Sequence, residues 1–317
     1  MTTQVPTLST NNQELLDDYI QDCQLRALTP GSIKSHRSNI RTVGSFLESR
    51  EQGYTDLDKD SMKDVLDYLL NKRKVSFKTL DCYFTSLSSF YEFLAYDDKI
   101  SGNPIPAFRK RYLKRYKNHN QESKRKLITI DQMSELINST LEIRDKTIMT
   151  ILAKTGVRRN ELLSMDLDEV DWKNQRIKLK PKKKRSNLYV YFDNETAVTL
   201  RKWIHAREYY PNKDSKSLFL GEQGNRIGRN ILYQLVIKHA TRVGLHNPNS
   251  SKLEDHFTPH CFRHWFTTNL RRGGMSREFI KELRGDSRGE AIDIYDHIDK
   301  KELRKAYLAA IPRLGIF

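Results

Sequence analysis

The sequence predicts a mainly α-helical protein of two domains, with a small antiparallel β-sheet in the second domain. A length of 317 residues with 37% hydrophobic content is enough for two domains that each bury a core. Apolar residues recur at helical spacing along most of the chain, whereas period-two alternation is confined to two short segments near its middle. Helices should therefore build both domains, and the sheet should be minor.

The first domain, residues 10–106, is expected to be a bundle of four helices. Apolar residues recur at helical spacing in four segments: 11–25, 33–47, 62–70 and 80–94. Thr29 followed by proline is a typical start for the second helix, and either Asp58 or Asp60 can cap the third. An Asn-Pro pair at 103–104 ends the fourth segment.

Residues 107–126 differ in composition and are expected to form a basic linker between the domains. Nine of them are Lys or Arg and one is acidic, with two tyrosines interleaved. Such a run is usually a solvated connector, but a linker that lies along DNA phosphates needs the same composition. We expect phosphate contacts from the following residues: Arg109, Lys110, Arg111, Lys114 and Arg115.

The second domain, residues 127–317, is expected to begin with three helices. Thr129 or Asp131 can cap the first, and the second spans about 143–154. Gly156 ends the second helix, because glycine readily adopts the left-handed backbone found at helix C-termini. A short third helix follows over 159–165.

A β-hairpin is expected next in the chain. Residues 176–180 and 188–192 alternate with period two on either side of a basic turn. Asp193 can cap a helix around 196–207, and 227–243 has the spacing of another amphipathic helix. A last helix has an apolar stripe that either packs on its own domain or docks on a neighbouring copy, formed by Leu303, Ala306, Tyr307, Ala310 and Ile311.

The balance of charged residues is strongly basic. Lys and Arg outnumber Asp and Glu by 56 to 40, a formal net charge of +16, so nucleic acid is the expected partner. Cys23, Cys82 and Cys261 form no CxxC pair, which argues against a disulfide framework or a zinc ribbon and favours the reducing cytoplasm. Neither a membrane span nor a signal peptide is expected, because the sequence lacks the long apolar runs that they need.

One segment has the composition of an anion site at the start of a helix. Thr258 is a good N-cap and the proline after it suits the first helical position. His260 and Arg263 then share a face of the first turn, beside backbone N–H groups that favour an anion. A phosphate would fit there, although an isolated HxxR pattern is more often an ordinary helix surface.

Two further groups of basic residues are ambiguous when taken alone. Arg158 lies between the glycine that ends one helix and the start of the next, where an anion is again favoured. The hairpin turn contains consecutive cations, which are usually solvated but could also supply a proton donor: Lys182, Lys183, Lys184 and Arg185.

The order and spacing of these motifs resemble the tyrosine recombinase family, which includes phage integrases and Xer-type recombinases. Residues 155–162 (TGVRRNEL) resemble its first arginine box, 260–264 (HCFRH) its HxxR box, and 294–297 (IYDH) the segment with its nucleophilic tyrosine. The resemblance covers nearly the whole chain. It implies a four-helix, SAM-like core-binding domain followed by a tyrosine-recombinase catalytic domain.

The resemblance implies roles for five residues. Tyr295 would attack the scissile phosphate and form a 3′-phosphotyrosyl link, with Arg158 and Arg263 as a guanidinium clamp. His260 would assist proton transfer or bind the phosphate. Lys182, or one of the two lysines after it, would protonate the leaving 5′ oxygen. The rest of the basic turn would contact DNA, through Lys183, Lys184 and Arg185.

The same resemblance implies the partners and the class of reaction. The substrate would be double-stranded DNA at a specific recombination site, bound by a homo-tetramer without metal, ATP or other cofactor. Integration of a mobile element or virus is favoured over Xer-type chromosome or plasmid dimer resolution, because the histidine pattern of Xer-type proteins is altered here.

One position departs from the family pattern. Where the family usually has a second histidine or another hydrogen-bond donor, residues 283–287 read LRGDS, and Asp286 is not an equivalent donor. An ionised carboxylate would repel a phosphate unless it were protonated or turned toward a cation such as Arg284 or Arg288. How the phosphate site is completed is therefore an open question for the structure.

Other protein classes explain less of the sequence. A DNA-binding regulator without catalysis accounts for the charge and the helices, but not for the five ordered positions. A metal-dependent nuclease would need clustered acidic or histidine ligands, which do not accompany these basic residues in the sequence. A type IB topoisomerase shares the chemistry, but the compact N-terminal helical segment favours a recombinase.

Overall fold

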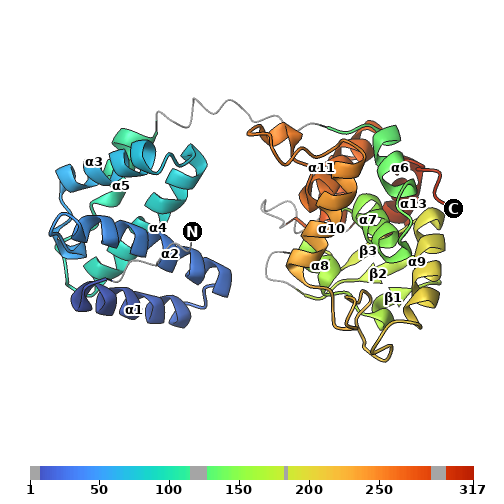
Figure 1. Ribbon diagram of the computed structural model, residues 1–317, viewed down its shortest axis with the longest axis horizontal. Coiled ribbons are helices and arrows are strands. Elements are labelled where there is room, and N and C mark those ends of the chain that lie inside the picture. Colours follow the sequence, from blue (N-terminus) through green and yellow to red (C-terminus); the bar gives the residue numbers. More distant parts are fainter. Residues whose placement is uncertain (1–7, 115–126, 182–184, 287–297) are drawn as a thin grey trace. The chain divides into compact units, whose positions relative to one another are not determined.

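The structure is a computed structural model, and it describes residues 8–114, 127–181, 185–286 and 298–317 (Figure 1). Clustering of contacts divides the chain into two compact units, Met1–Glu122 and Ser123–Phe317. The described residues are mainly helical with one three-stranded antiparallel sheet, so the predicted fold class is confirmed. Among them, no helix is both long enough and apolar enough to cross a membrane.

The first unit contains the four expected helices, which are α1 (Thr10–Leu25), α2 (Pro30–Glu48), α3 (Lys59–Asp67) and α4 (Phe77–Tyr96). The Thr29 hydroxyl accepts the Ser32 N–H and caps α2. Asp58 rather than Asp60 caps α3, because its carboxylate accepts the first N–H groups of that helix. A single core of aliphatic and aromatic side chains holds the helices together.

Several short elements of the first unit were not predicted, namely η1 (Tyr54–Asp56), η2 (Tyr68–Lys72), α5 (Ile105–Phe108) and η3 (Arg109–Leu113). The last two matter for the expected linker. Phe108 and Leu113 are buried in the core of this unit, and the Phe108 ring stacks on Phe84 at 5.5 Å between centroids. Residues 107–113 are therefore helical and are held on the core by Phe108 and Leu113, because apolar side chains at helical spacing lie between the basic ones.

Besides the short 3₁₀ helices η5 (Leu167–Glu169) and η6 (Leu253–Asp255), the described parts of the second unit contain eight α-helices. They are α6 (Ile130–Asn138), α7 (Ile143–Thr155), α8 (Arg159–Leu163), α9 (Asn194–Arg207), α10 (Arg229–Arg242), α11 (Pro259–Arg272), α12 (Arg277–Arg284) and α13 (Lys300–Ala310). Figure 1 shows α7 in the middle of this unit, where it packs against both α9 and α11. Helix α12 was not predicted, because eight residues are short for a periodic pattern, although its apolar side chains gather on one face.

The sheet has the order β1-β2-β3, with β1 (Val170–Asp171), β2 (Arg176–Lys178) and β3 (Tyr189–Tyr191). Its register pairs Ile177 with Val190, and both side chains are buried in the core. The hairpin formed by β2 and β3 was predicted. Strand β1 was not, because two residues are too few to show period-two alternation.

A buried lysine joins the end of α7 to the C-terminal residues. Lys154 Nζ, which is fully buried, contacts Asp193 Oδ2 and the Pro312 carbonyl at 2.6 Å each, and also Glu195 Oε2. Glu195 in turn accepts the backbone N–H groups of Leu314 and Ile316. The charged side chain is therefore satisfied, and the last residues of the chain pack on their own unit.

The apolar stripe of α13 also packs within its own unit. Leu303, Tyr307 and Ala310 are buried in a cluster with side chains of α11 and α12. The Tyr307 hydroxyl donates to the Lys154 carbonyl at 2.9 Å. In this single chain, the stripe thus takes the first of the two positions considered from the sequence.

Replacing Lys154 with methionine should destabilise the second unit by about 3–5 kcal/mol, because two carboxylates would lose their buried cation. Urea unfolding followed by tryptophan fluorescence measures this, since every tryptophan belongs to that unit, at positions Trp172, Trp203 and Trp265. The matched control is Lys146→Met on the same helix, which should cost about 1 kcal/mol or less. Equal losses for the two variants would contradict the anchoring role.

Candidate active site

The end of α7 places the first basic residue of the site. Gly156 has a φ of 60°, a left-handed conformation that favours glycine, and a Cβ there would lie 2.3 Å from Phe266 Cδ1. The chain can therefore turn sharply before Arg158, which precedes α8. The Gly156 carbonyl also accepts a hydrogen bond from Arg263 Nη1 at 2.7 Å, so the same turn orients the second basic residue.

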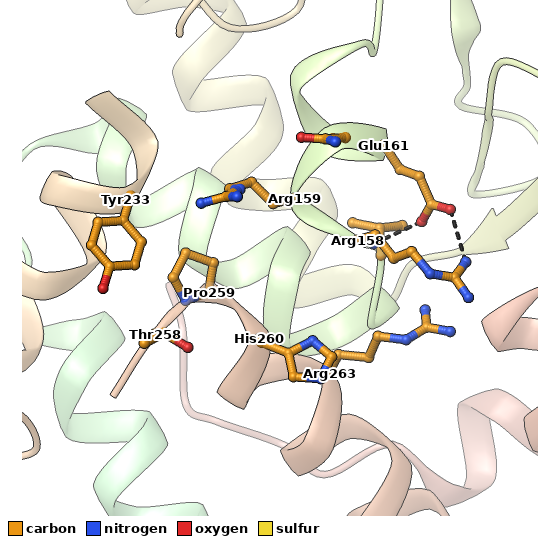
Figure 2. A pocket seen from close by; sticks show the side chains of 10 residues that line it. Arg158, Arg159, Glu161, Tyr233, Thr258, Pro259, His260 and Arg263 are labelled. Atoms are coloured by element: carbon orange, nitrogen blue, oxygen red, sulfur yellow. Dashed lines mark hydrogen bonds and ion pairs between the residues drawn. The ribbon is translucent and has the colours of Figure 1, made fainter. Parts of the chain in front are cut away.

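Arg158 and Arg263 converge although they are far apart in the sequence. Arg158 Nη2 and Arg263 Nη2 lie 3.1 and 3.0 Å from the same oxygen, Asp286 Oδ1. Both guanidinium groups also donate to the Arg284 carbonyl, at 3.4 and 2.8 Å. Figure 2 shows the two side chains extending in the same direction, although Arg158 comes from the residue before α8 and Arg263 from α11. Two planar donors thus meet at one position that holds an anion.

The first turn of α11 places His260 beside this pair (Figure 2). Its side chain is exposed, and its ring lies 4.6 Å from the His264 ring between centroids. The helix begins at Pro259 as expected, and the Thr258 N–H donates to Cys261 Sγ at 3.3 Å. His260 and Arg263 therefore lie in the first turn of α11, as expected. The His260 side chain is exposed, whereas the Arg263 side chain is only 4% exposed.

A buried carboxylate holds Arg158 in place. Glu161, which is 3% exposed, accepts the Arg158 N–H at 2.7 Å and Arg158 Nη1 at 3.1 Å. Burial raises the pKa of Glu161, but Arg185 and then Arg158 more than offset this, and the pKa lies below its ordinary value. Glu161 is therefore a permanent counterion inside a cluster of arginines.

Arg185 does not lie where the basic turn suggested. We expected it to be solvated and to contact DNA, but its side chain is only 1% exposed. It donates to Glu161 Oε2 at 3.0 Å and to the Leu283 and Arg284 carbonyls at 3.1 Å each. Gly285 leaves room for it, because a Cβ there would lie 2.6 Å from Arg185 Cγ. Arg185 thus positions its neighbours, since its donors are already used inside the protein.

The concentration of positive charge affects Arg263 itself. Burial and then the charges of Arg158 and Arg284 lower the pKa of Arg263 to about 10, whereas Asp286 and Glu161 act in the opposite direction. Arg263 is still protonated at neutral pH. Burial is the main cause of the lowered pKa, and the two neighbouring arginines add to it.

A cavity of about 480 Å³ opens beside the arginine pair (Figure 2). Its lining includes two residues that the sequence analysis did not single out, Arg159 and Tyr233. Arg159 follows Arg158 directly, so its position next to the arginine box was an available signal. Tyr233 comes from α10, and no local motif connects it to the site.

The other expected site residues are placed as follows. Lys182, Lys183, Lys184, Tyr295 and Arg115 lie outside the described residues. The described basic residues of the expected linker all belong to the first unit, where Arg109 pairs with Asp81 at 2.8 Å and the other three are exposed: Lys110, Arg111 and Lys114.

Among the described residues, no group of three or more His, Cys, Asp or Glu side chains is placed to hold a metal ion. The arrangement at α8, α11 and α12 instead combines guanidinium donors with an exposed imidazole. Such a site suits an oxyanion with several oxygens, as a phosphate has.

Glu161→Gln should destabilise the second unit by about 3 kcal/mol at neutral pH, because Arg158 and Arg185 would lose their shared counterion. Folding lowers the pKa of Glu161, so the wild-type advantage should be complete above its ordinary value of 4.5 and shrink as the pH falls through the folded-state value. Urea unfolding at a series of pH values measures this. Glu208→Gln, at an exposed carboxylate, is the control and should have little effect at any pH.

Comparison with known proteins gives the same two-part division. Residues 126–302 match the phage integrase family, and residues 15–100 match the phage integrase N-terminal SAM-like domain. The tyrosine recombinase XerC of Psychromonas ingrahamii is 26% identical over 308 residues, which cover 95% of this chain and 97% of that protein.

Two solved structures have the same fold. The Tn1549 transposon integrase in complex with circular intermediate DNA has a TM-score of 0.65 at 19% identity, covering 92% of this chain and 98% of that one. A λ integrase dimer bound to a core site has a TM-score of 0.66 at 14% identity, covering 91% and 98%. The chain therefore belongs to the phage integrase family of tyrosine recombinases, enzymes that cut and rejoin DNA at specific sites.

Proposed function

We propose that this recombinase cleaves DNA with Tyr295 as the nucleophile, while Arg158 and Arg263 hold the scissile phosphate. The observation that supports this most is the convergence of both guanidinium groups on one carboxylate oxygen, Asp286 Oδ1. A carboxylate oxygen between two guanidinium groups marks a position that a non-bridging phosphate oxygen can take.

The proposed chemistry needs only side chains of the protein. The Tyr295 hydroxyl releases its proton to His260 or to water as its oxygen forms a bond to phosphorus. The bond from phosphorus to the 5′ oxygen breaks, which leaves a 3′-phosphotyrosyl link. Arg158 and Arg263 stabilise the charge that grows on the non-bridging oxygens. Lys182 donates the proton that the leaving 5′ oxygen takes up, and His260 hydrogen-bonds the phosphate. Rejoining reverses these steps with a 5′-hydroxyl, so the energy of the broken bond is retained.

We infer that the substrate is double-stranded DNA at a specific site, bound by a homo-tetramer in the cytoplasm. The net charge of +16 and the exposed cations Lys110, Arg111 and Lys114 support binding to the phosphate backbone. The λ integrase structure contains a dimer on a core site, which is consistent with assembly on DNA. Arg185 acts by positioning Glu161 and Arg284, and the DNA contacts of the turn come from Lys183 and Lys184.

Tyr295→Phe should abolish the covalent protein–DNA adduct that the wild-type protein forms with supercoiled or nicked DNA in EDTA, because no other group supplies the attacking oxygen. Denaturing gels measure the adduct. Tyr209→Phe, at an exposed tyrosine, is the control and should leave the adduct unchanged. An adduct that survives in Tyr295→Phe but disappears in Tyr233→Phe would assign the nucleophile to the cavity tyrosine of α10. Cleavage that depends on Mg²⁺ would refute the mechanism.

Lys182→Ala should slow cleavage by about 10²–10⁴-fold, because the leaving oxygen loses its proton donor. A substrate with sulfur at the leaving position needs no proton donor, so it should restore the rate in this variant. Lys183→Ala and Lys184→Ala are matched controls from the same turn. If sulfur rescues one of these controls instead, that lysine is the proton donor.

A further inference from the structure

We propose that the Asp286 carboxylate is an internal competitor for the phosphate position of Arg158 and Arg263, and that the scissile phosphate must displace it. This inference rests on the proposed function, since it concerns the same arginine pair. It goes further by assigning a role to the residue at which the chain departs from the pattern of its family.

The contacts of Asp286 support a competing role. Its Oδ1 atom lies 3.1 Å from Arg158 Nη2 and 3.0 Å from Arg263 Nη2, while its Oδ2 atom lies 3.1 Å from Arg284 Nε. Carboxylate and phosphate oxygens use the same guanidinium donors. The carboxylate and a phosphate cannot both occupy this position, and their like charges repel each other.

Electrostatics explain why the DNA-free protein needs this carboxylate. Burial and then the charges of Arg158 and Arg284 lower the pKa of Arg263, and Asp286 counteracts that effect. A bound phosphate would supply the same negative charge. Asp286 therefore stabilises the arginine pair when DNA is absent and becomes redundant once DNA is bound.

Open space next to the Asp286 carboxylate allows its side chain to move away from the arginine pair. Asp286 is 29% exposed, in contrast to the buried Glu161. It borders a second cavity of about 600 Å³, which Arg271, Lys281 and Arg284 also line. Arg284 Nε is ion-paired with Asp286, but it has no hydrogen-bond partner among the described residues. A rotation toward Arg284 would free the pair and improve this contact.

The backbone at Asp286 is held independently of its side chain. Its N–H donates to the Lys281 carbonyl at 3.2 Å, and its carbonyl accepts the Ser186 hydroxyl at 3.0 Å. Removing the negative charge should therefore leave the end of α12 in place. Asp286→Asn keeps the shape of the side chain and is the appropriate test.

The first experiment measures binding of inorganic phosphate by its effect on the melting temperature of the full chain. Without phosphate, Asp286→Asn should melt below wild type, because three arginines lose a counterion. When phosphate is added, the melting temperature of Asp286→Asn should rise more than that of wild type. Phosphate should bind the variant about tenfold more tightly if the carboxylate blocks the site about nine-tenths of the time. Asp171→Asn is the matched control, since that carboxylate is similarly exposed and pairs with Arg176 at 2.8 Å. It should respond to phosphate as wild type does.

An equal phosphate response in wild type and Asp286→Asn would overturn the inference. Asp286→Ala provides a second variant if the asparagine protein does not fold. This outcome is separate from the proposed function, because phosphate binding needs no catalysis. If wild type forms no DNA adduct but Asp286→Asn gains phosphate affinity, the proposed cleavage fails and the competing carboxylate stands.

The second experiment measures the rate of adduct formation on nicked DNA. At subsaturating DNA, Asp286→Asn should form the adduct several-fold faster than wild type, because more of the protein is competent to bind the phosphate. At saturating DNA the two rates should converge. A slower rate for Asp286→Asn at saturating DNA would show that the carboxylate takes part in the chemistry, which contradicts its role as a competitor.

Discussion

The carbonyl oxygen of Arg284, at the C-terminal end of α12, is the point on which the catalytic site depends. It accepts hydrogen bonds from Arg158, Arg185 and Arg263, at 3.4, 3.1 and 2.8 Å. Carbonyls at the end of a helix carry partial negative charge, so they stabilise cations. Gly285, with a φ of 59°, ends the helix and leaves space for the Arg185 side chain. The end of α12 thus binds arginines that come from the start of α8, from α11 and from the hairpin.

Two carboxylates complete this cationic site, and their burial gives them different roles. Glu161 is inside the unit, where it neutralises Arg158 and Arg185 at all times. Asp286 is partly exposed and lies where we propose that the scissile phosphate binds. On that proposal one counterion is permanent and the other is replaceable, so the strongly basic site stays folded without DNA. Stability and substrate binding are linked through the same arginines.

The last turn of α7 connects the site to the rest of the second unit. Lys154 anchors the C-terminal residues through Pro312, and the Gly156 carbonyl orients Arg263. Only one residue separates Lys154 from Gly156, so a shift of this helix end would move both the C-terminal anchor and the carbonyl that orients Arg263. Close packing would transmit such a shift, because protein interiors have low compressibility. The phosphate site and the docked C-terminus are thus held by one rigid element.

Local patterns in the sequence were sufficient to predict most helices and the hairpin, because caps and periodicity depend on neighbouring residues. The pairing of Arg158 with Arg263 was expected only from the family resemblance. Local patterns did not predict α12, the burial of Arg185 or the packing of Phe108. A run of basic residues predicts exposed side chains, and Arg185 is buried only because residues distant in the sequence accept its hydrogen bonds. One partner of Asp286, Arg158, is also 128 residues away in the sequence. Sequence alone therefore determined which residues could form a phosphate site, and the tertiary structure decided which charges neutralise them, because ion pairing depends on distances that only folding sets.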